Sequence, residues 1–118
     1  MARALHGVAE LPQFIRDAQS LGLSEDERQR IVDAIAADPL QGDEIRGSGG
    51  VRKVRFAGRG KGKSGGYRVM TAYFGTNAPV YLIALLSKGE RANFSAAEIA
   101  GFKDLTALIA RCWRKRQK

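Results

Sequence analysis

Cysteine, histidine and long apolar runs are scarce in this chain of 118 residues. The single cysteine, Cys112, excludes an intramolecular disulfide, and the single histidine, His6, leaves no Cys/His cluster for a structural metal. The longest apolar run, Val80 to Leu86, is far shorter than the roughly 18 residues that a membrane-spanning helix needs. Met1 to Glu10 lacks the apolar stretch of a secretory signal. We therefore expect a single soluble, cytoplasmic domain over residues 1–118 that uses no metal and no cofactor.

Acidic side chains are also scarce beyond residue 44. Residues 1–44 carry four basic and nine acidic side chains, whereas residues 45–118 carry sixteen basic and three acidic ones, and the whole chain has a net charge of +8. From Arg46 to Arg68 there are eight basic residues and no acidic one. A surface that only needs solubility intersperses the two signs. The asymmetry therefore favours a polyanionic partner held by the C-terminal two-thirds.

The N-terminal half predicts two antiparallel helices. Apolar residues recur at helical spacing from Leu11, and Gly22 suits the end of this first helix. Ser24 and Glu27 form a capping box that starts a second helix, which Asp38-Pro39 ends. Because the connection is short, the two helices are expected to form a hairpin.

The rest of the chain predicts strands and one more helix. Ala2 to Val8 suits a short edge strand, and Gln41 to Gly50 reads as a turn region. Three strands are expected at Val51–Ala57, Tyr67–Phe74 and Pro79–Leu86, and a capping box at Ser95 and Glu98 begins a final helix. The predicted fold is α+β, with the helical hairpin and the C-terminal helix packed on an antiparallel sheet of about four strands.

Ala57 to Ser64 satisfies a relaxed nucleotide-binding pattern, in which a small residue and four others precede Gly-Lys-Ser. Such a phosphate loop needs a helix directly after it, whose amides bind the phosphates. Here Gly65-Gly66 and a strand pattern follow instead. The segment is therefore interpreted as a glycine-rich, cationic hairpin loop that could close on a phosphate backbone.

Three segments, Gly49–Phe56, Gly60–Val69 and Tyr81–Ser95, resemble the RelE/ParE superfamily of bacterial type II toxins, and the HigB branch in particular. The resemblance covers nearly the whole chain. It implies a twisted sheet of the microbial-RNase type. It also implies a toxin that cleaves mRNA on the translating ribosome, and that a cognate, HigA-like, DNA-binding antitoxin holds inactive. RelE carries a tyrosine early in its final segment, where this chain offers Asn93 and Phe94.

RNA cleavage without a metal drives the ribose 2′-OH onto the adjacent phosphate, which requires a base, an acid and cations. Because there is one histidine, lysines are expected to transfer the protons. Lys63 is the preferred base, with Lys61 as its competitor, because neighbouring cations lower the pKa of a lysine. Arg68 is expected to bind the scissile phosphate through its two-pronged guanidinium, and Lys88 either to protonate the leaving oxygen or to add positive charge.

A second group of residues is predicted to bind RNA around the cut. It comprises Arg52, Lys53, Arg55, Arg59, Asn93 and Phe94. Two of the cations, Arg52 and Lys53, could equally be solvated surface charges. Phe94 could stack on a base or act as a hydrophobic staple beside the helix cap.

Two other functions remain open at this stage. A toxin of the ParE type would inhibit DNA gyrase by binding it, and a non-catalytic RNA-binding domain would bind RNA in a salt-dependent way without cutting it. In the toxin interpretations an acidic antitoxin segment is expected to neutralise the basic surface.

Overall fold

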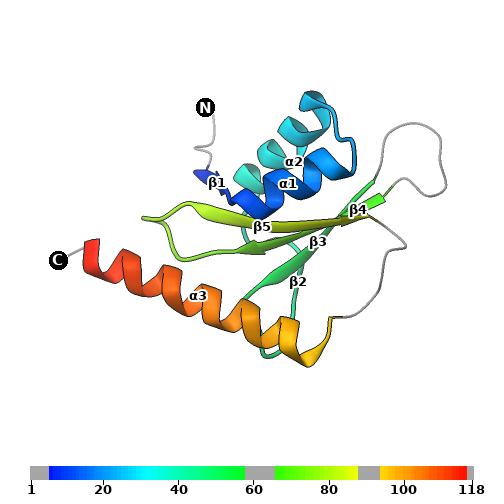
Figure 1. Cartoon of the computed structure of the whole chain (residues 1–118). Coiled ribbons are helices and arrows are strands. Elements are labelled where there is room, and N and C mark those ends of the chain that lie inside the picture. Colours follow the sequence, from blue (N-terminus) through cyan, green and yellow to red (C-terminus); the bar gives the residue numbers. More distant parts are fainter. Residues whose placement is uncertain (1–5, 58–65, 88–93, 117–118) are drawn as a thin grey trace.

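The computed structural model describes residues 6–57, 66–87 and 94–116. Three helices, α1 (Pro12–Ser20), α2 (Glu25–Ala37) and α3 (Ala96–Arg116), accompany five strands. The strands are β1 (Val8–Glu10), β2 (Asp43–Glu44), β3 (Arg52–Ala57), β4 (Gly66–Ala72) and β5 (Val80–Ser87). Figure 1 shows the α1–α2 hairpin on one face of the sheet and α3 on the other. The predicted α+β class is confirmed, and none of the described helices has the length and apolarity to span a membrane.

The sheet differs from the predicted one in strand number and direction. Its order is β1-β5-β4-β3-β2, and β1 pairs with β5 in parallel while the other pairs are antiparallel. The edge strand expected at Ala2–Val8 forms at Val8–Glu10, and the turn region contains β2. A two-residue strand is too short to show alternation, and alternation does not report strand direction. Both differences therefore concern features that the sequence pattern does not encode.

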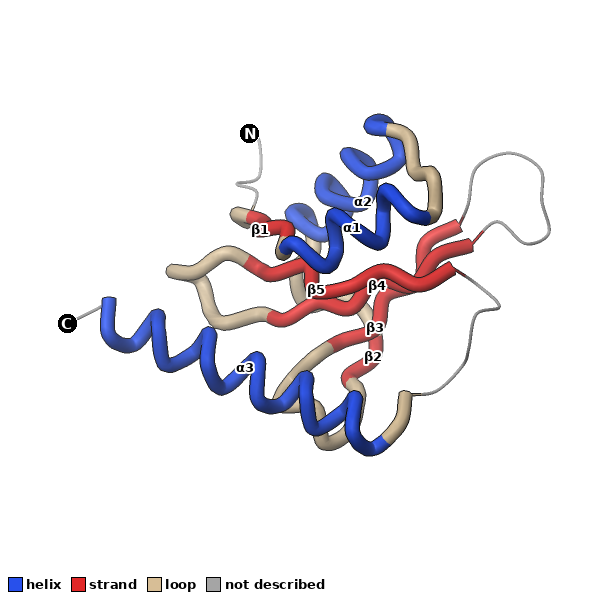
Figure 2. Tube along the Cα trace, in the orientation of Figure 1, coloured by secondary structure: helices blue, strands red, loops and turns tan. Residues whose placement is uncertain are grey.

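Each face of the sheet carries its own apolar core. Between the sheet and the α1–α2 hairpin lie fully buried side chains that include Phe14, Ile35, Val69 and Leu82. On the opposite face, Val51, Met70 and Ile83 are buried, and Phe102 and Leu105 of α3 pack against them. The chain therefore builds a three-layer arrangement with the sheet in the middle (Figure 2).

A bulge in β5 is linked to α1. Met70 pairs with Ala84 and Thr71 with Leu82, so Ile83 has no partner in the ladder. Beyond the bulge, the backbone N–H of Leu85 donates a hydrogen bond of 2.9 Å to Oδ2 of Asp17. This contact ties the helical hairpin to the sheet at its irregular point.

Local side-chain contacts define the helix starts. The capping box is complete at α2, where Glu27 N donates to Ser24 Oγ at 3.1 Å and Ser24 N donates to Glu27 Oε1 at 3.0 Å. The same exchange links Ser95 and Glu98 at α3, with distances of 3.1 and 2.8 Å. Both predicted capping boxes are confirmed.

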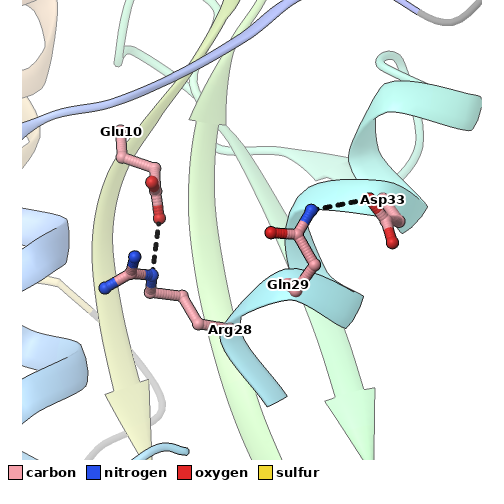
Figure 3. Close-up of polar contacts among 4 residues, drawn as sticks. All are labelled: Glu10, Arg28, Gln29 and Asp33. Atoms are coloured by element: carbon pink, nitrogen blue, oxygen red, sulfur yellow. Dashed lines mark hydrogen bonds and ion pairs between the residues drawn. The ribbon is translucent and has the colours of Figure 1, made fainter. Parts of the chain in front are cut away.

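Helix α2 is also joined to β1. Arg28 Nε lies 3.1 Å from Glu10 Oε2, an ion pair without hydrogen-bond alignment (Figure 3). On the outer face of the same helix, Gln29 Nε2 donates to Asp33 Oδ1 at 2.9 Å (Figure 3). The first contact holds two elements together, whereas the second lies within one helix.

The turn before β3 positions α3 through a glycine. Gly49 has a φ of +79°, and a Cβ atom there would collide with Thr106 Oγ1 of α3. In the same turn the buried Ser48 donates from Oγ to Ile45 O at 2.6 Å and accepts from Val51 N at 3.0 Å. This close approach sets α3 against the part of the sheet where β3 begins.

Candidate active site

Two arginines of the predicted site face each other across neighbouring strands. In the antiparallel β3–β4 ladder, Arg55 pairs directly with Arg68. Directly opposed residues have Cβ atoms about 4.5–5.5 Å apart and project on the same face. Lys53, two residues before Arg55, shares that face because side chains alternate along a strand. The sheet therefore gathers three cations on the face that α3 also contacts.

The direct opposition of two arginines places like charges side by side on the sheet. Like charges directly opposite each other on a sheet destabilise it. Asp43 pairs with Lys53 across β2 and β3, yet no carboxylate among the described residues lies within ion-pair distance of Lys53 or Arg55. Positive side chains that gather on one face attract a phosphate group.

Two adjoining hollows contain these cations. The larger, of about 440 Å³, is lined by Lys53, Arg55 and Arg68 together with Gln41, Gly42, Asp43 and Val54. The smaller, of about 240 Å³, lies at the end of the β3–β4 ribbon. Its lining consists of Arg55, Phe56, Ala57, Gly66, Tyr67 and Arg68. Because both arginines line both hollows, an anion held there can receive two guanidinium groups at once.

The other predicted RNA-binding residues that the structure describes lie elsewhere. Arg52 is on the opposite face of β3, and its Nη1 donates to the Gly42 carbonyl oxygen at 3.0 Å. Phe94 packs edge-to-face on Phe102, with ring centroids 5.3 Å apart, and joins the core beneath α3. The structure separates both from the Arg55–Arg68 pair, and the packing of Phe94 matches the staple alternative.

Five predicted residues lie outside the described part of the chain, namely Arg59, Lys61, Lys63, Lys88 and Asn93. Their neighbours in the chain are placed. Ala57 pairs with Gly66 at the end of the β3–β4 ribbon, so residues 58–65 connect two strand ends that adjoin the arginine pair. Ser87, the last residue of β5, pairs with Tyr67 at the same end of the sheet.

His6 takes part in local structure near the other edge. Its Nε2 lies 2.7 Å from the Ala78 carbonyl oxygen, to which it can donate, and its ring packs against Tyr73 at a centroid distance of 5.3 Å. Among the residues that the structure describes, no three His, Cys, Asp or Glu side chains gather as metal ligands would.

Sequence reasoning missed an aromatic pair beside the cations. Phe56 and Tyr67 pair directly across β3 and β4, next to the Arg55–Arg68 pair, and project on the α2 side. Burial raises the pKa of the Tyr67 phenol, and the negative charge of Glu27 raises it further. Because side chains alternate along β3, Phe56 and Arg55 lie on opposite faces of the sheet. Which residue of β4 pairs with Phe56 depends on the register of the two strands, which the sequence pattern does not give.

The comparisons with known proteins agree with the fold. The structure of the E. coli toxin RelE, an arginine-to-alanine double mutant in the free state, is similar with a TM-score of 0.55. The match covers 86% of this chain and 97% of that chain at 14% sequence identity, and it shows the fold. A sequence model described as the RelE toxin of the RelE/RelB toxin–antitoxin system matches residues 10–117. This chain belongs to the RelE toxin family.

Proposed function

We propose that this chain is the toxin of a type II toxin–antitoxin system that cleaves mRNA on the translating ribosome. The direct pairing of Arg55 and Arg68 on one sheet face is the observation that carries the proposal. Two guanidinium groups with a lysine beside them suit a phosphodiester, because the planar forks bind phosphoryl oxygens in pairs. Membership in the RelE toxin family supports the same class.

The proposed reaction is an intramolecular displacement at phosphorus. The ribose 2′-oxygen attacks the adjacent phosphate, its proton passes to Lys63 or Lys61, and the bond to the 5′-oxygen of the next nucleotide breaks. Lys88 gives a proton to that leaving oxygen. The products are a 2′,3′-cyclic phosphate and a 5′-hydroxyl end, so atoms and charges balance. Arg68 and Arg55 stabilise the negative charge that builds on the phosphoryl oxygens during the attack.

Two kinds of partner follow from this proposal. The substrate is mRNA in the ribosome, which places the action in the cytoplasm. The inhibitor is a cognate antitoxin, which the HigB resemblance implies to be HigA-like and DNA-binding. An acidic antitoxin segment is expected on the face that carries Lys53, Arg55 and Arg68, because charge complementarity guides such pairs.

The test is brief induction of the toxin in cells that lack the antitoxin, followed by primer extension on abundant mRNAs. Wild-type protein is expected to stop growth and to leave cuts within translated regions. Arg68→Ala is expected to abolish both, whereas Arg16→Ala, which removes an exposed arginine of α1, is the matched control and should cut normally.

Other outcomes would identify other functions. Intact mRNA with DNA double-strand breaks would indicate a gyrase inhibitor. RNA binding that falls with salt but produces no cut ends would indicate a non-catalytic RNA-binding domain. Either result would overturn the proposed nuclease.

A further inference from the structure

The larger hollow beside the arginine pair contains a carboxylate that the proposed reaction does not use. Asp43 of β2 lines this hollow together with Lys53, Arg55 and Arg68. Asp43 pairs directly with Lys53 across β2 and β3, so the two side chains project on the same face of the sheet. An RNA strand whose phosphate is bound at the arginines can therefore reach Asp43 without leaving that face.

The turn before β2 defines the position of Asp43. Gly42 has a φ of +100°, and a Cβ atom there would collide with the Lys53 carbonyl oxygen and with the side chain of Val54. The Gly42 carbonyl oxygen accepts a hydrogen bond of 3.0 Å from Arg52 Nη1. These contacts hold the backbone at Asp43 against β3, and the short side chain of Asp43 keeps its carboxylate close to that backbone.

A carboxylate in a phosphate-binding hollow needs a hydrogen-bond donor as its partner. Asp43 repels a phosphate, because both groups are negatively charged. RNA offers two classes of donor, the N–H groups of the bases and the 2′-hydroxyl of the ribose. Proteins bind unpaired bases by stacking them on aromatic rings, and none of the described residues that line this hollow is aromatic. The hollow therefore favours the ribose over a base.

The spacing favours a ribose next to the one that reacts. Asp43 lies one strand spacing, about 4.8 Å, from Lys53, which precedes Arg55 by two residues, or about 6.8 Å along β3. The Cα atoms of Asp43 and Arg55 are therefore roughly 8 Å apart. The attacking 2′-oxygen must approach to within about 3.5 Å of the phosphorus at the arginine pair. Asp43 is thus better placed for the 2′-hydroxyl of a neighbouring nucleotide.

We propose that Asp43 binds the 2′-hydroxyl of a nucleotide next to the one that is cut, and that it selects ribose over deoxyribose at that position. Arg55 and Arg68 bind the scissile phosphate, Lys53 faces the next phosphate, and Asp43 accepts the hydroxyl hydrogen of the adjoining sugar. The inference rests on the proposed function, because it follows the same RNA strand across the hollow. It makes Asp43 a specificity-determining residue of the cleavage.

The experiment combines one change in the protein with one change in the RNA. Translating ribosomes receive synthetic mRNAs with a mapped cut, either all-ribose or with a single 2′-deoxynucleotide directly before or directly after the nucleotide that reacts. At one of these positions the deoxy change is expected to slow cutting by wild-type protein about tenfold, because it removes a hydrogen bond to a charged group. Asp43→Ala should cut the all-ribose mRNA about tenfold more slowly than wild type, and the deoxy change should slow it no further.

Glu44→Ala is the matched control. Glu44 is also an exposed carboxylate of β2, but it pairs with Arg52 and projects on the opposite face of the sheet. This variant should cut the all-ribose mRNA at the wild-type rate and keep the tenfold effect of the deoxy change. Thermal unfolding of both purified variants shows that they are folded.

Four results would overturn the inference and leave the nuclease itself standing. Wild-type cutting that neither deoxy position slows would show that no flanking 2′-hydroxyl is bound. A deoxy effect that persists in Asp43→Ala would show that another group binds this hydroxyl, and a slowing by Asp43→Ala that adds to it would indicate a structural role. Faster cutting by Asp43→Ala would show that the carboxylate only offsets the positive charge of the hollow.

A binding measurement decides the inference if wild-type protein makes no cuts, which would remove the proposed function. The probes are a single-stranded oligoribonucleotide and the oligodeoxynucleotide of the same sequence, with uracil in both. Wild type and Glu44→Ala are expected to bind the ribose probe about tenfold more tightly than the deoxyribose probe, and Asp43→Ala is expected to lose this preference. Equal binding of both probes by wild type, or an undiminished preference in Asp43→Ala, would overturn the inference.

Discussion

Arg55 and Arg68 stand directly opposite each other on β3 and β4, with Lys53 on the same face. A sheet that only had to fold would avoid this juxtaposition, because opposed like charges reduce its stability. A phosphodiester bound between the two arginines, as proposed above, would offset this cost. The same charges then lower the stability of the free toxin and bind the substrate.

Charge reversal at one arginine separates the two effects. Arg55→Glu would place opposite charges on the β3–β4 ladder, and the free energy of unfolding is expected to rise by less than about 1 kcal/mol, since the side chain is exposed. RNA cleavage is expected to fall at least tenfold. Urea unfolding and a cleavage assay measure the two quantities.

A matched control for this charge reversal is Arg16→Glu on the exposed side of α1. It makes the same change of net charge without touching the sheet, so cleavage should stay near the wild-type rate. Equal losses of cleavage in both variants would show that overall charge matters and the opposed pair does not.

The hydrogen bond from Leu85 N to Asp17 predicts a stability effect at the β5 bulge. Asp17→Ala leaves this backbone donor without its partner, and the free energy of unfolding should fall by about 1–3 kcal/mol. Asp33→Ala removes an exposed carboxylate that accepts a hydrogen bond from Gln29 within α2, and should change stability by less than about 0.5 kcal/mol. Urea denaturation measures both free energies. Equal losses in Asp17→Ala and Asp33→Ala would show that the hydrogen bond to Leu85 does not stabilise the fold.

Gly49 is expected to tolerate a side chain less well than Gly22, which also has a positive φ. Both Gly49 and Gly22 have a positive φ, but a Cβ atom at Gly22 meets nothing within 4 Å, whereas at Gly49 it collides with Thr106 of α3. Gly22→Ala is therefore expected to cost about 1 kcal/mol, and Gly49→Ala at least twice that. Similar melting temperatures for the two variants would show that α3 does not need this close approach.

The raised pKa of Tyr67 predicts a late phase in the alkaline titration. The neutral phenol is favoured in the folded state by burial first and by the Glu27 charge second. Folded stability associated with Tyr67 is therefore present below its unfolded pKa of about 10 and is lost as the pH rises through the higher folded value. Absorbance of the phenolate follows this step directly.

Tyr67→Phe should remove the late phase of the titration. Glu27→Gln should shift the phase toward lower pH without abolishing it, because burial remains. A titration in Tyr67→Phe that still contains the late phase would show that the signal comes from another tyrosine.

Local chemistry explains which parts of the fold the sequence could predict. The Ser24–Glu27 and Ser95–Glu98 capping boxes depend on residues three apart, and both form as expected. Alternation of side chains along β3 puts Val54 with Phe56 on one face and Arg55 on the other, as the structure shows. The same alternation puts Arg52 and Lys53 on opposite faces of β3.

Features that depend on contacts between distant segments could not be predicted from local sequence patterns. The parallel pairing of β1 with β5 joins residues about seventy positions apart in the chain, and β2 is defined only by its pairing with β3. The register that opposes Arg55 to Arg68 and Phe56 to Tyr67 follows from the β3–β4 ladder. The small hollow between Phe56 and Tyr67 of the sheet and Glu27 of α2 additionally requires the packing of α2, which no strand pattern encodes.

The central claim, that this toxin uses the 2′-oxygen of mRNA as nucleophile beside the Arg55–Arg68 pair, can be tested at one nucleotide. Translating ribosomes would receive an mRNA with a single 2′-deoxynucleotide on the 5′ side of a mapped cut. The account predicts no cut at that position, normal cuts at the other sites, and none anywhere with Arg68→Ala. Cutting at the 2′-deoxynucleotide, or full cutting by Arg68→Ala, would contradict it.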